Sequence, residues 1–162
     1  MPKLDLDAIP QTNATGYPPE YAGKVAGRWY RRLAPAAGLD DFGASYVELK
    51  PGAWSSQRHW HEEEDEIVVM LSGEAVLVDD NGRTPMKPGD VAAFPKGDGN
   101  GHVLINESEE SCFFIAVAVP RQAIATIPIS TCTLKTGAAS SARTARNSTM
   151  ERRSRSPFRI SR

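Results

Sequence analysis

"HWHEEEDEIVVMLSG", residues 59–73, contains two histidines one residue apart, a run of acidic residues and then an apolar run. Alternate residues of a β-strand share a face, so His59 and His61 project together if this segment is extended. Glu66 would begin the next strand, where an antiparallel neighbour places its carboxylate opposite the imidazoles. Imidazole and carboxylate ligands suit divalent first-row metals. The segment therefore indicates a metal site. The alternative is a solvated acidic hairpin, which suits residues 62–64 best.

Residues 43–119 consist of short apolar segments separated by turn residues. An Asn-Gly pair at 81–82 is a hairpin signal, because both central residues of a type I′ turn have positive φ. No stretch of comparable length in this region repeats its apolar residues with a helical period. Many short strands at close spacing predict an all-β barrel or sandwich. The predicted strands are 43–50, 55–61, 66–73, 74–80, 91–95, 102–106 and 112–119.

Two segments resemble the paired motifs of the cupins. "GAWSSQRHWHEEEDEIVVMLSG" (52–73) is similar to the first motif, G-x5-H-x-H-x(3,4)-E-x6-G, with one extra residue before the first histidine. "GDVAAFPKGDGNGHVLIN" (89–106) is similar to the second motif, G-x5-P-x-G-x2-H-x3-N, with two extra residues before His102. Fifteen residues separate Gly73 from Gly89, as in compact single-domain cupins.

This resemblance implies an antiparallel double-stranded β-helix, or jelly-roll barrel, that holds one divalent metal ion. The implied ligands are His59, His61, Glu66 and His102. Asp65 is the rival for the acidic ligand, because the family allows three or four residues between the second histidine and the acid. Glu66 is preferred because the apolar run IVVML follows it directly. The metal can be Mn, Fe, Ni, Zn or Cu. No organic cofactor is implied, and no catalytic residue is assigned.

Strand alternation also predicts part of a substrate pocket. Gln57 shares the face of the two motif-one histidines, Met70 that of Glu66 and Leu104 that of His102, while Phe94 is a candidate rim residue. No lysine or arginine falls on this face in these strands. A phosphorylated substrate would therefore need a cation from elsewhere, for which the segment 28–32 is a candidate.

The resemblance leaves the reaction open among isomerases, dioxygenases, decarboxylases and lyases, because a fold does not determine a function. We expect a metal-dependent enzyme that acts on a small oxygenated molecule, either sugar-like or an organic acid. The alternative is a non-catalytic cupin that binds or senses such a molecule. Residues 1–42 are too short and too rich in proline to form a helix-turn-helix. Cupins are commonly dimers, so a homodimer is expected, with the arm at 1–35 as the element exchanged.

Charge is distributed unevenly along the chain. Residues 1–120 hold 10 Lys and Arg against 19 Asp and Glu, whereas residues 121–162 hold 9 against 1. The acidic body argues against a nucleic-acid partner, and ion pairs within that body are expected for Arg28, Arg31 and Arg32. The chain has no apolar run of 18 residues and no apolar segment of a signal peptide near its start. These observations predict a cytoplasmic protein without a membrane partner.

The expected organisation is an N-terminal arm with an edge strand (1–35), a cupin barrel (36–122) and a C-terminal tail (123–162). The tail is rich in Ser, Thr, Ala and Arg and is predicted to be irregular, because it has few large apolar residues to bury. A back-translation of residues 131–144, read one base earlier, yields a sequence similar to the usual ending of bacterial cupins. We therefore hypothesise that a frameshift replaced the terminus from about residue 130; an ordinary basic tail is the alternative.

Overall fold

The structure is a computed structural model that describes residues 3–119 of the 162-residue chain. The predictions for the tail, including the frameshift hypothesis, concern residues outside the described part. The helical elements are η1 (Leu6–Ala8), α1 (Pro19–Val25) and α2 (Leu33–Ala36). The strands are β1 (Arg28–Arg32), β2 (Gly43–Leu49), β3 (Glu66–Ser72), β4 (Ala75–Asp79), β5 (Gly82–Met86), β6 (Val91–Phe94), β7 (Val103–Ile105) and β8 (Cys112–Ala118).

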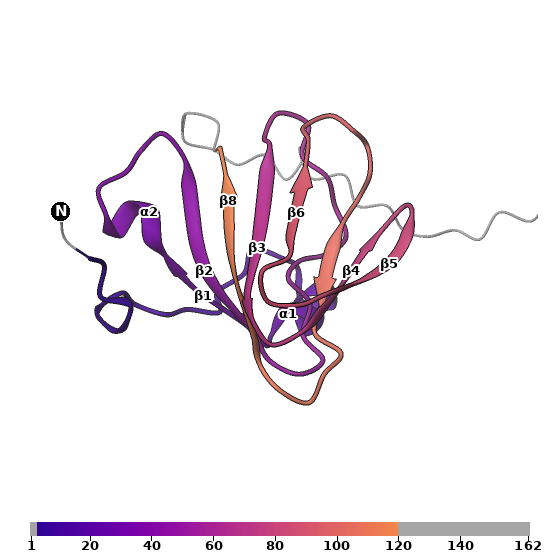
Figure 1. Cartoon of the computed structure of the whole chain (residues 1–162), viewed down its shortest axis with the longest axis horizontal. Coiled ribbons are helices and arrows are strands. Elements are labelled where there is room, and N and C mark those ends of the chain that lie inside the picture. Colours follow the sequence, from indigo (N-terminus) through magenta and orange to yellow (C-terminus); the bar gives the residue numbers. More distant parts are fainter. Residues whose placement is uncertain (1–2, 120–162) are drawn as a thin grey trace, which may run out of the picture.

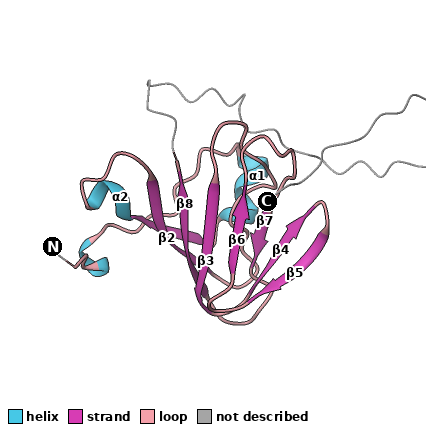
Figure 2. Ribbon diagram, turned by 45° about the horizontal axis from the view of Figure 1, so that its top comes forward, coloured by secondary structure: helices cyan, strands magenta, loops and turns pink. Residues whose placement is uncertain are grey.

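The strands form two sheets that face each other. The larger sheet has the order β1-β2-β8-β3-β6, and the smaller has the order β5-β4-β7. Every pairing between strands in these sheets is antiparallel. Figure 1 shows β8 between β2 and β3, and Figure 2 shows β4 and β5 across from the larger sheet. The prediction of an all-β antiparallel jelly-roll barrel is confirmed.

The hydrophobic core fills one end of the space between the sheets. Strand alternation points apolar side chains of both sheets inward, including Leu49, Met70, Leu104 and Phe114, each of which is at most 3% exposed. Gly73 allows the chain to turn tightly after β3. Its φ is 69°, and a Cβ there would lie 2.7 Å from the Cα of Cys112. No helix among residues 3–119 is long and apolar enough to cross a membrane.

The hairpin predicted from Asn81-Gly82 is present, but its turn lies one residue earlier. Asp79 pairs with Gly82, so Asp80 and Asn81 form the two-residue loop and Gly82 begins β5. The Asp79 carboxylate accepts hydrogen bonds from both the backbone N–H and the side chain of Asn81. These bonds fix the loop at residues 80–81.

The predicted strand at 55–61 is wrong as a continuous element. Residues 54–61 pair with residues 102–105 at two isolated bridges, Trp54 with Ile105 and His59 with His102. The two bridges are five residues apart on the side of Trp54 and His59 but three apart on the side of His102 and Ile105. The first side therefore has two extra residues, which form a bulge. The extra residue seen before His59 in the first motif lies in this stretch. Strict alternation of side chains from residue 55 to residue 61 consequently fails.

The N-terminal arm is more structured than its proline content predicts. It includes η1 and α1, and α1 begins at Pro19, where the missing N–H of proline costs nothing. Thr12 and Tyr30 exchange backbone hydrogen bonds, so the arm pairs with the outer edge of β1. As expected, β1 is an edge strand of the larger sheet. The expected boundary at residue 35 falls inside α2.

Candidate metal centre

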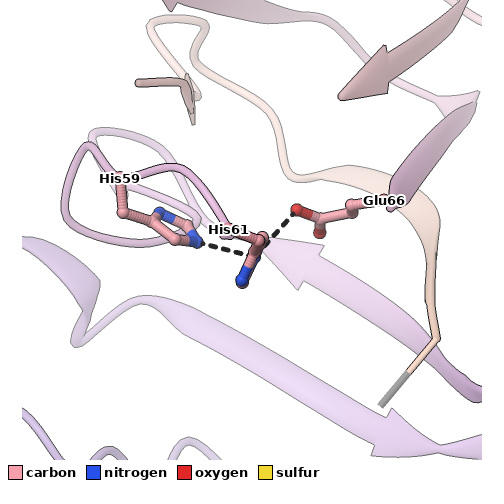
Figure 3. A group of neighbouring side chains, drawn as sticks. All are labelled: His59, His61 and Glu66. Atoms are coloured by element: carbon pink, nitrogen blue, oxygen red, sulfur yellow. Dashed lines mark hydrogen bonds and ion pairs between the residues drawn. The ribbon is translucent and has the colours of Figure 1, made fainter. Parts of the chain in front are cut away.

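The bulged segment brings two histidines to one point. The Nε2 atoms of His59 and His61 lie 3.2 Å apart (Figure 3). Their rings are close to perpendicular, with an interplanar angle of 85°. Two ring nitrogens that face each other at this distance are arranged like neighbouring ligands of one ion, since a shared cation would stabilise both lone pairs.

Glu66 is the first residue of β3 and lies between β6 and β8, paired with Phe94 and Ala118. Its Oε2 atom is 3.5 Å from the Nε2 of His61 and 3.1 Å from the Nε2 of His102. The ligand atoms of His59, His61 and Glu66 all lie within 4.8 Å of one another, as a group that could hold a metal ion.

His102 adjoins this group but is not one of its three members. His102 is only 3% exposed, and its ring centroid is 5.1 Å from that of His59 and 6.3 Å from that of His61. The structure therefore brings His102 to the same carboxylate oxygen as His61 and orients its Nε2 towards the centre. The Nδ1 atom of His102 is buried and has no hydrogen-bond partner among the described residues.

The protonation of the group suits a metal ligand set. Burial, together with neighbouring His61 and His102, lowers the pKa of His59 to about 4, so its imidazole is neutral at pH 7. Its Nδ1 lies 2.8 Å from the carbonyl oxygen of Gln57 and donates a hydrogen bond to it, which leaves the lone pair on Nε2. Metal-binding histidines commonly have a carbonyl or carboxylate partner of this kind.

The carboxylate of Glu66 is ionised. Burial alone would raise the pKa of Glu66, but hydrogen bonds with His102 and His61 outweigh it and bring the pKa to about 2. The hydrogen bond between Glu66 and His61 is also the main cause that raises the pKa of His61. One negative charge therefore faces two of the imidazoles, and two or three nitrogen donors with one oxygen donor fit a divalent first-row ion.

The remaining acidic residues before β3 are placed differently. The rival Asp65 points to another loop, because its Oδ1 accepts a hydrogen bond from the backbone N–H of Lys96 at 2.9 Å. Glu62 and Glu63 are exposed, as expected for a solvated hairpin. Glu64 is closer to the site than that interpretation implies, since its Oε2 is 3.7 Å from the Nδ1 of His61.

The group opens onto a cavity of about 740 Å³ between the two sheets. This volume lies in the range of small-molecule sites. His59, His61, Glu66 and His102 all line it. Of the four side chains expected in a pocket, Leu104 lines this cavity, whereas Gln57, Met70 and Phe94 are not among the residues that line it.

The three other side chains have separate roles in packing. Gln57 lies in the bulge, where alternation fails, and its amide donates to the carbonyl of Tyr21. Met70 is 1% exposed and belongs to the core at the closed end of the barrel. The ring of Phe94 stacks on the imidazole of His102, with centroids 3.6 Å apart and planes at 8°. Phe94 thereby fixes the orientation of a candidate ligand.

β1, β2 and β8 supply much of the cavity wall, of which only the segment 28–32 was expected from the sequence, as a candidate source of a cation. Arg28, Tyr30 and Arg32 line the cavity from β1. Alternation along the five residues of β1 predicts that these three share a face, but which face lies inward depends on the pairing with β2. The ion pairs expected for Arg28, Arg31 and Arg32 are not formed among residues 3–119.

A pH dependence follows from the buried His59. In the unfolded chain His59 takes up a proton near pH 6.5, whereas the folded protein keeps it neutral down to about pH 4. The unfolded state binds the extra proton between these values, so the stability linked to His59 falls as the pH decreases from 6.5 to 4. The raised pKa of His61 acts in the opposite direction, because its stabilisation is complete below pH 6.5 and is lost as the pH rises through the folded value.

We expect the metal-free wild type to lose about 1 to 2 kcal/mol more stability than His59→Gln between pH 7 and pH 5. Urea unfolding of both chelator-treated proteins at the two pH values measures this difference. His61 remains in both proteins, so its opposing contribution largely cancels. Identical changes in the two proteins would show that His59 is not held neutral by the fold.

Comparison with known proteins identifies the family of the chain. The family model of the Cupin domain matches residues 45–118. A crystal structure of a sugar phosphate isomerase of the cupin superfamily from Silicibacter pomeroyi is 47% identical, covers 74% of this chain and 76% of its own, and superposes with a TM-score of 0.73. The chain therefore belongs to the cupin superfamily. A search of curated proteins gave no match.

Two further crystal structures are more distant. A Cupin 2 conserved barrel domain protein from Salinispora arenicola is 27% identical, with 74% of this chain and 87% of that chain covered and a TM-score of 0.54. A protein predicted to be an oxalate decarboxylase from Thermotoga maritima is 28% identical, with 57% of this chain and 79% of that chain covered and a TM-score of 0.50. The similar structures are thus described as enzymes of more than one reaction class.

Proposed function

We propose that the protein is a metal-dependent cupin enzyme that acts on a small oxygenated molecule, sugar-like or an organic acid. The observation that carries this proposal is the convergence of His59, His61 and Glu66 on the wall of a cavity of about 740 Å³. His102 is proposed as a fourth ligand, because its Nε2 faces the same carboxylate oxygen as that of His61. A bound divalent ion would supply a Lewis acid for an oxygen of the substrate.

The side chains around the ion would have distinct tasks. The neutral His59 is held by Gln57, and His102 is held by stacking on Phe94, so two ligands are oriented before a metal arrives. The ionised Glu66 offsets positive charge at the centre. Preorganisation of this kind is typical of a working site rather than of a surface cluster.

Isomerisation of a sugar phosphate is the reaction class we favour, because the 47%-identical relative from Silicibacter pomeroyi is described as a sugar phosphate isomerase. Such a reaction moves hydrogen within one molecule and needs no external oxidant. Dioxygenase and lyase chemistry are the other classes that this type of centre supports.

Metal analysis and a substrate panel test the proposal together. The protein would be purified without a histidine tag, its metal content measured, and the loaded protein incubated with aldose phosphates and hydroxy acids under air and under nitrogen. Proton NMR in D₂O detects isomerisation as product formation, and deuterium uptake shows whether the transferred hydrogen exchanges with solvent. We expect about one divalent ion per chain and turnover that chelation abolishes. Binding without turnover would establish the non-catalytic alternative, and absence of metal binding would overturn the proposal.

A homodimer is the proposed state of assembly. The outward face of β3 and β6 exposes large apolar side chains, with Ile67 39% and Val91 57% exposed. We expect this face to pack against a second copy, since exposed apolar clusters favour association. Sedimentation at micromolar concentration should show a species of twice 17.6 kDa, and Val91→Lys should shift it towards the monomer. A wild-type protein that sediments only as a 17.6 kDa species would contradict this expectation.

A further inference from the structure

The larger sheet gives the cavity a basic side opposite the candidate metal centre. Arg28, Tyr30 and Arg32 alternate along β1 and line the cavity from the edge of the sheet. Glu66 lines it from β3, three strands away in the order β1-β2-β8-β3. At about 4.8 Å between neighbouring strands, β1 and β3 are roughly 14 Å apart across the sheet. Arg32 lies in the same row as Val68, two residues from Glu66, whereas Arg28 lies further along the strands towards the core.

The floor between these two sides is lined by small side chains. Arg32 pairs with Ser45, Ser45 with Ala116, and Ala116 with Val68 across the sheet. Ser45 and Ala116 both line the cavity, as does Ala118, which pairs with Glu66. Short side chains in this row leave room above the sheet. In the next row towards the core Val47 pairs with Phe114, and both also line the cavity.

Arg28 is held in place but has unused hydrogen-bonding capacity. Its Nη1 donates to the carbonyl of Ser55 at 2.8 Å, and its guanidinium lies 5.3 Å from the ring centroid of Tyr30. Its Nε is buried and has no hydrogen-bond partner among the described residues. Ser55 belongs to the segment that carries His59 and His61, so the arginine is bonded to the same stretch of backbone as the metal centre.

The charge of Arg28 is not neutralised within residues 3–119, where no carboxylate forms an ion pair with it. Burial lowers the pKa of Arg28, which reflects the cost of removing the guanidinium from water. A partly buried cation without an acidic partner is costly unless a ligand supplies the negative charge. Asp40 is the acidic residue besides Glu66 that lines the cavity, and it is an exposed residue in the loop before β2.

We propose that Arg28, flanked by Arg32 and Tyr30, forms an anion subsite that binds the acidic group of the substrate while the oxygenated end of the same molecule faces the metal centre. The guanidinium recognises a carboxylate or a phosphate through paired N–H donors. This inference rests on the proposed function, which assigns the other end of the substrate to the metal ion. The subsite itself binds anions without metal.

The test compares Arg28→Gln with Arg31→Gln. Both changes remove one positive charge from β1, but Arg31 points to the other face of the sheet and does not line the cavity. Inorganic phosphate, acetate and the neutral control glycerol would be titrated into chelator-treated protein at fixed ionic strength, and backbone amide shifts recorded by NMR. Melting temperatures establish that each variant is folded.

We expect saturable binding of at least one anion by the wild type, with shifts centred on β1 and Ser55. Arg28→Gln should raise the Kd about tenfold or more, Arg28→Lys less, and Arg31→Gln by no more than about twofold. Tighter binding of phosphate than of acetate would indicate a phosphorylated substrate, and the reverse a carboxylate. Equal effects of Arg28→Gln and Arg31→Gln, or no saturable binding of either anion, would overturn the subsite.

Metal content of the same variants separates this inference from the proposed function. Arg28→Gln should bind the divalent ion as the wild type does, because Arg28 is not in the ligand group. If the wild type binds anions through Arg28 but binds no metal, the proposed function fails and the subsite stands. If the wild type binds metal but Arg28→Gln and Arg31→Gln bind anions equally well, the subsite fails and the proposed function stands.

Discussion

Glu66→Gln is expected to weaken the binding of Mn²⁺ or Zn²⁺ by more than about 100-fold, because changes to groups that merely support metal ligands already cost 10- to 100-fold. The substitution keeps the size of the side chain and removes its charge. Glu66 contacts both His61 and His102, so its loss also disturbs the orientation of two imidazoles. Competition with a chromogenic chelator measures the affinity.

Asp65→Asn is the matched control for this experiment. It makes the same chemical change at the neighbouring residue, whose carboxylate binds the backbone of Lys96. We expect its affinity for metal to stay within about threefold of the wild type, since an exposed charge nearby contributes little. A large loss in Asp65→Asn with little change in Glu66→Gln would make Asp65 the acidic ligand. Equal affinities in all three proteins would remove both from the site.

Asn106→Ala is expected to destabilise the fold by about 3 kcal/mol, because it leaves several buried polar groups without partners. The side chain of Asn106 is fully buried. Its amide donates to the carbonyls of Leu49 and Glu110 at 2.8 and 2.7 Å, and its carbonyl oxygen accepts from the backbone N–H and the hydroxyl of Ser108. One of these four hydrogen bonds reaches β2 at Leu49, and the other three hold the loop before β8 together.

Urea unfolding of the metal-free proteins measures this loss without the contribution of metal binding. Asn100→Ala serves as the control, since Asn100 also makes two side-chain hydrogen bonds but is only partly buried. We expect about 1 kcal/mol for that variant. Comparable losses in the two variants would mean that burial of the Asn106 network contributes little to stability.

The fold could be predicted from the sequence largely because its turns and spacings are local. Asn81-Gly82 indicated the β4–β5 hairpin, and the prediction was off by one residue because the Asp79 carboxylate binds Asn81. Motif spacing gave Glu66 its place at the start of β3. These features depend on neighbours within a few residues, which a single sequence records.

The cavity wall could not be predicted in the same way because it depends on pairing between distant segments. Alternation placed Gln57 beside His59, but the two-residue bulge between the Trp54 and His59 bridges turns its side chain towards Tyr21. Arg28 reaches the cavity only because β1 pairs with β2 in a register that turns it inward. The segment 28–32 was a candidate source of a cation, but neither the bulge nor the strand register is visible in the residues themselves.

The central position of β8 has a consequence for the order in which the molecule is built. Arg28 and Glu66 lie in opposite halves of the larger sheet, and β8 is the strand that joins β1-β2 to β3-β6. Pairing of β8 with β2 closes a loop of more than sixty residues, and contacts so distant in sequence form slowly. A chain still emerging from the ribosome before Cys112 has both motifs with their histidines but no sheet to align them with β1. We therefore expect the complete cavity to appear in one late, cooperative step, so that nascent chains cannot assemble it piece by piece.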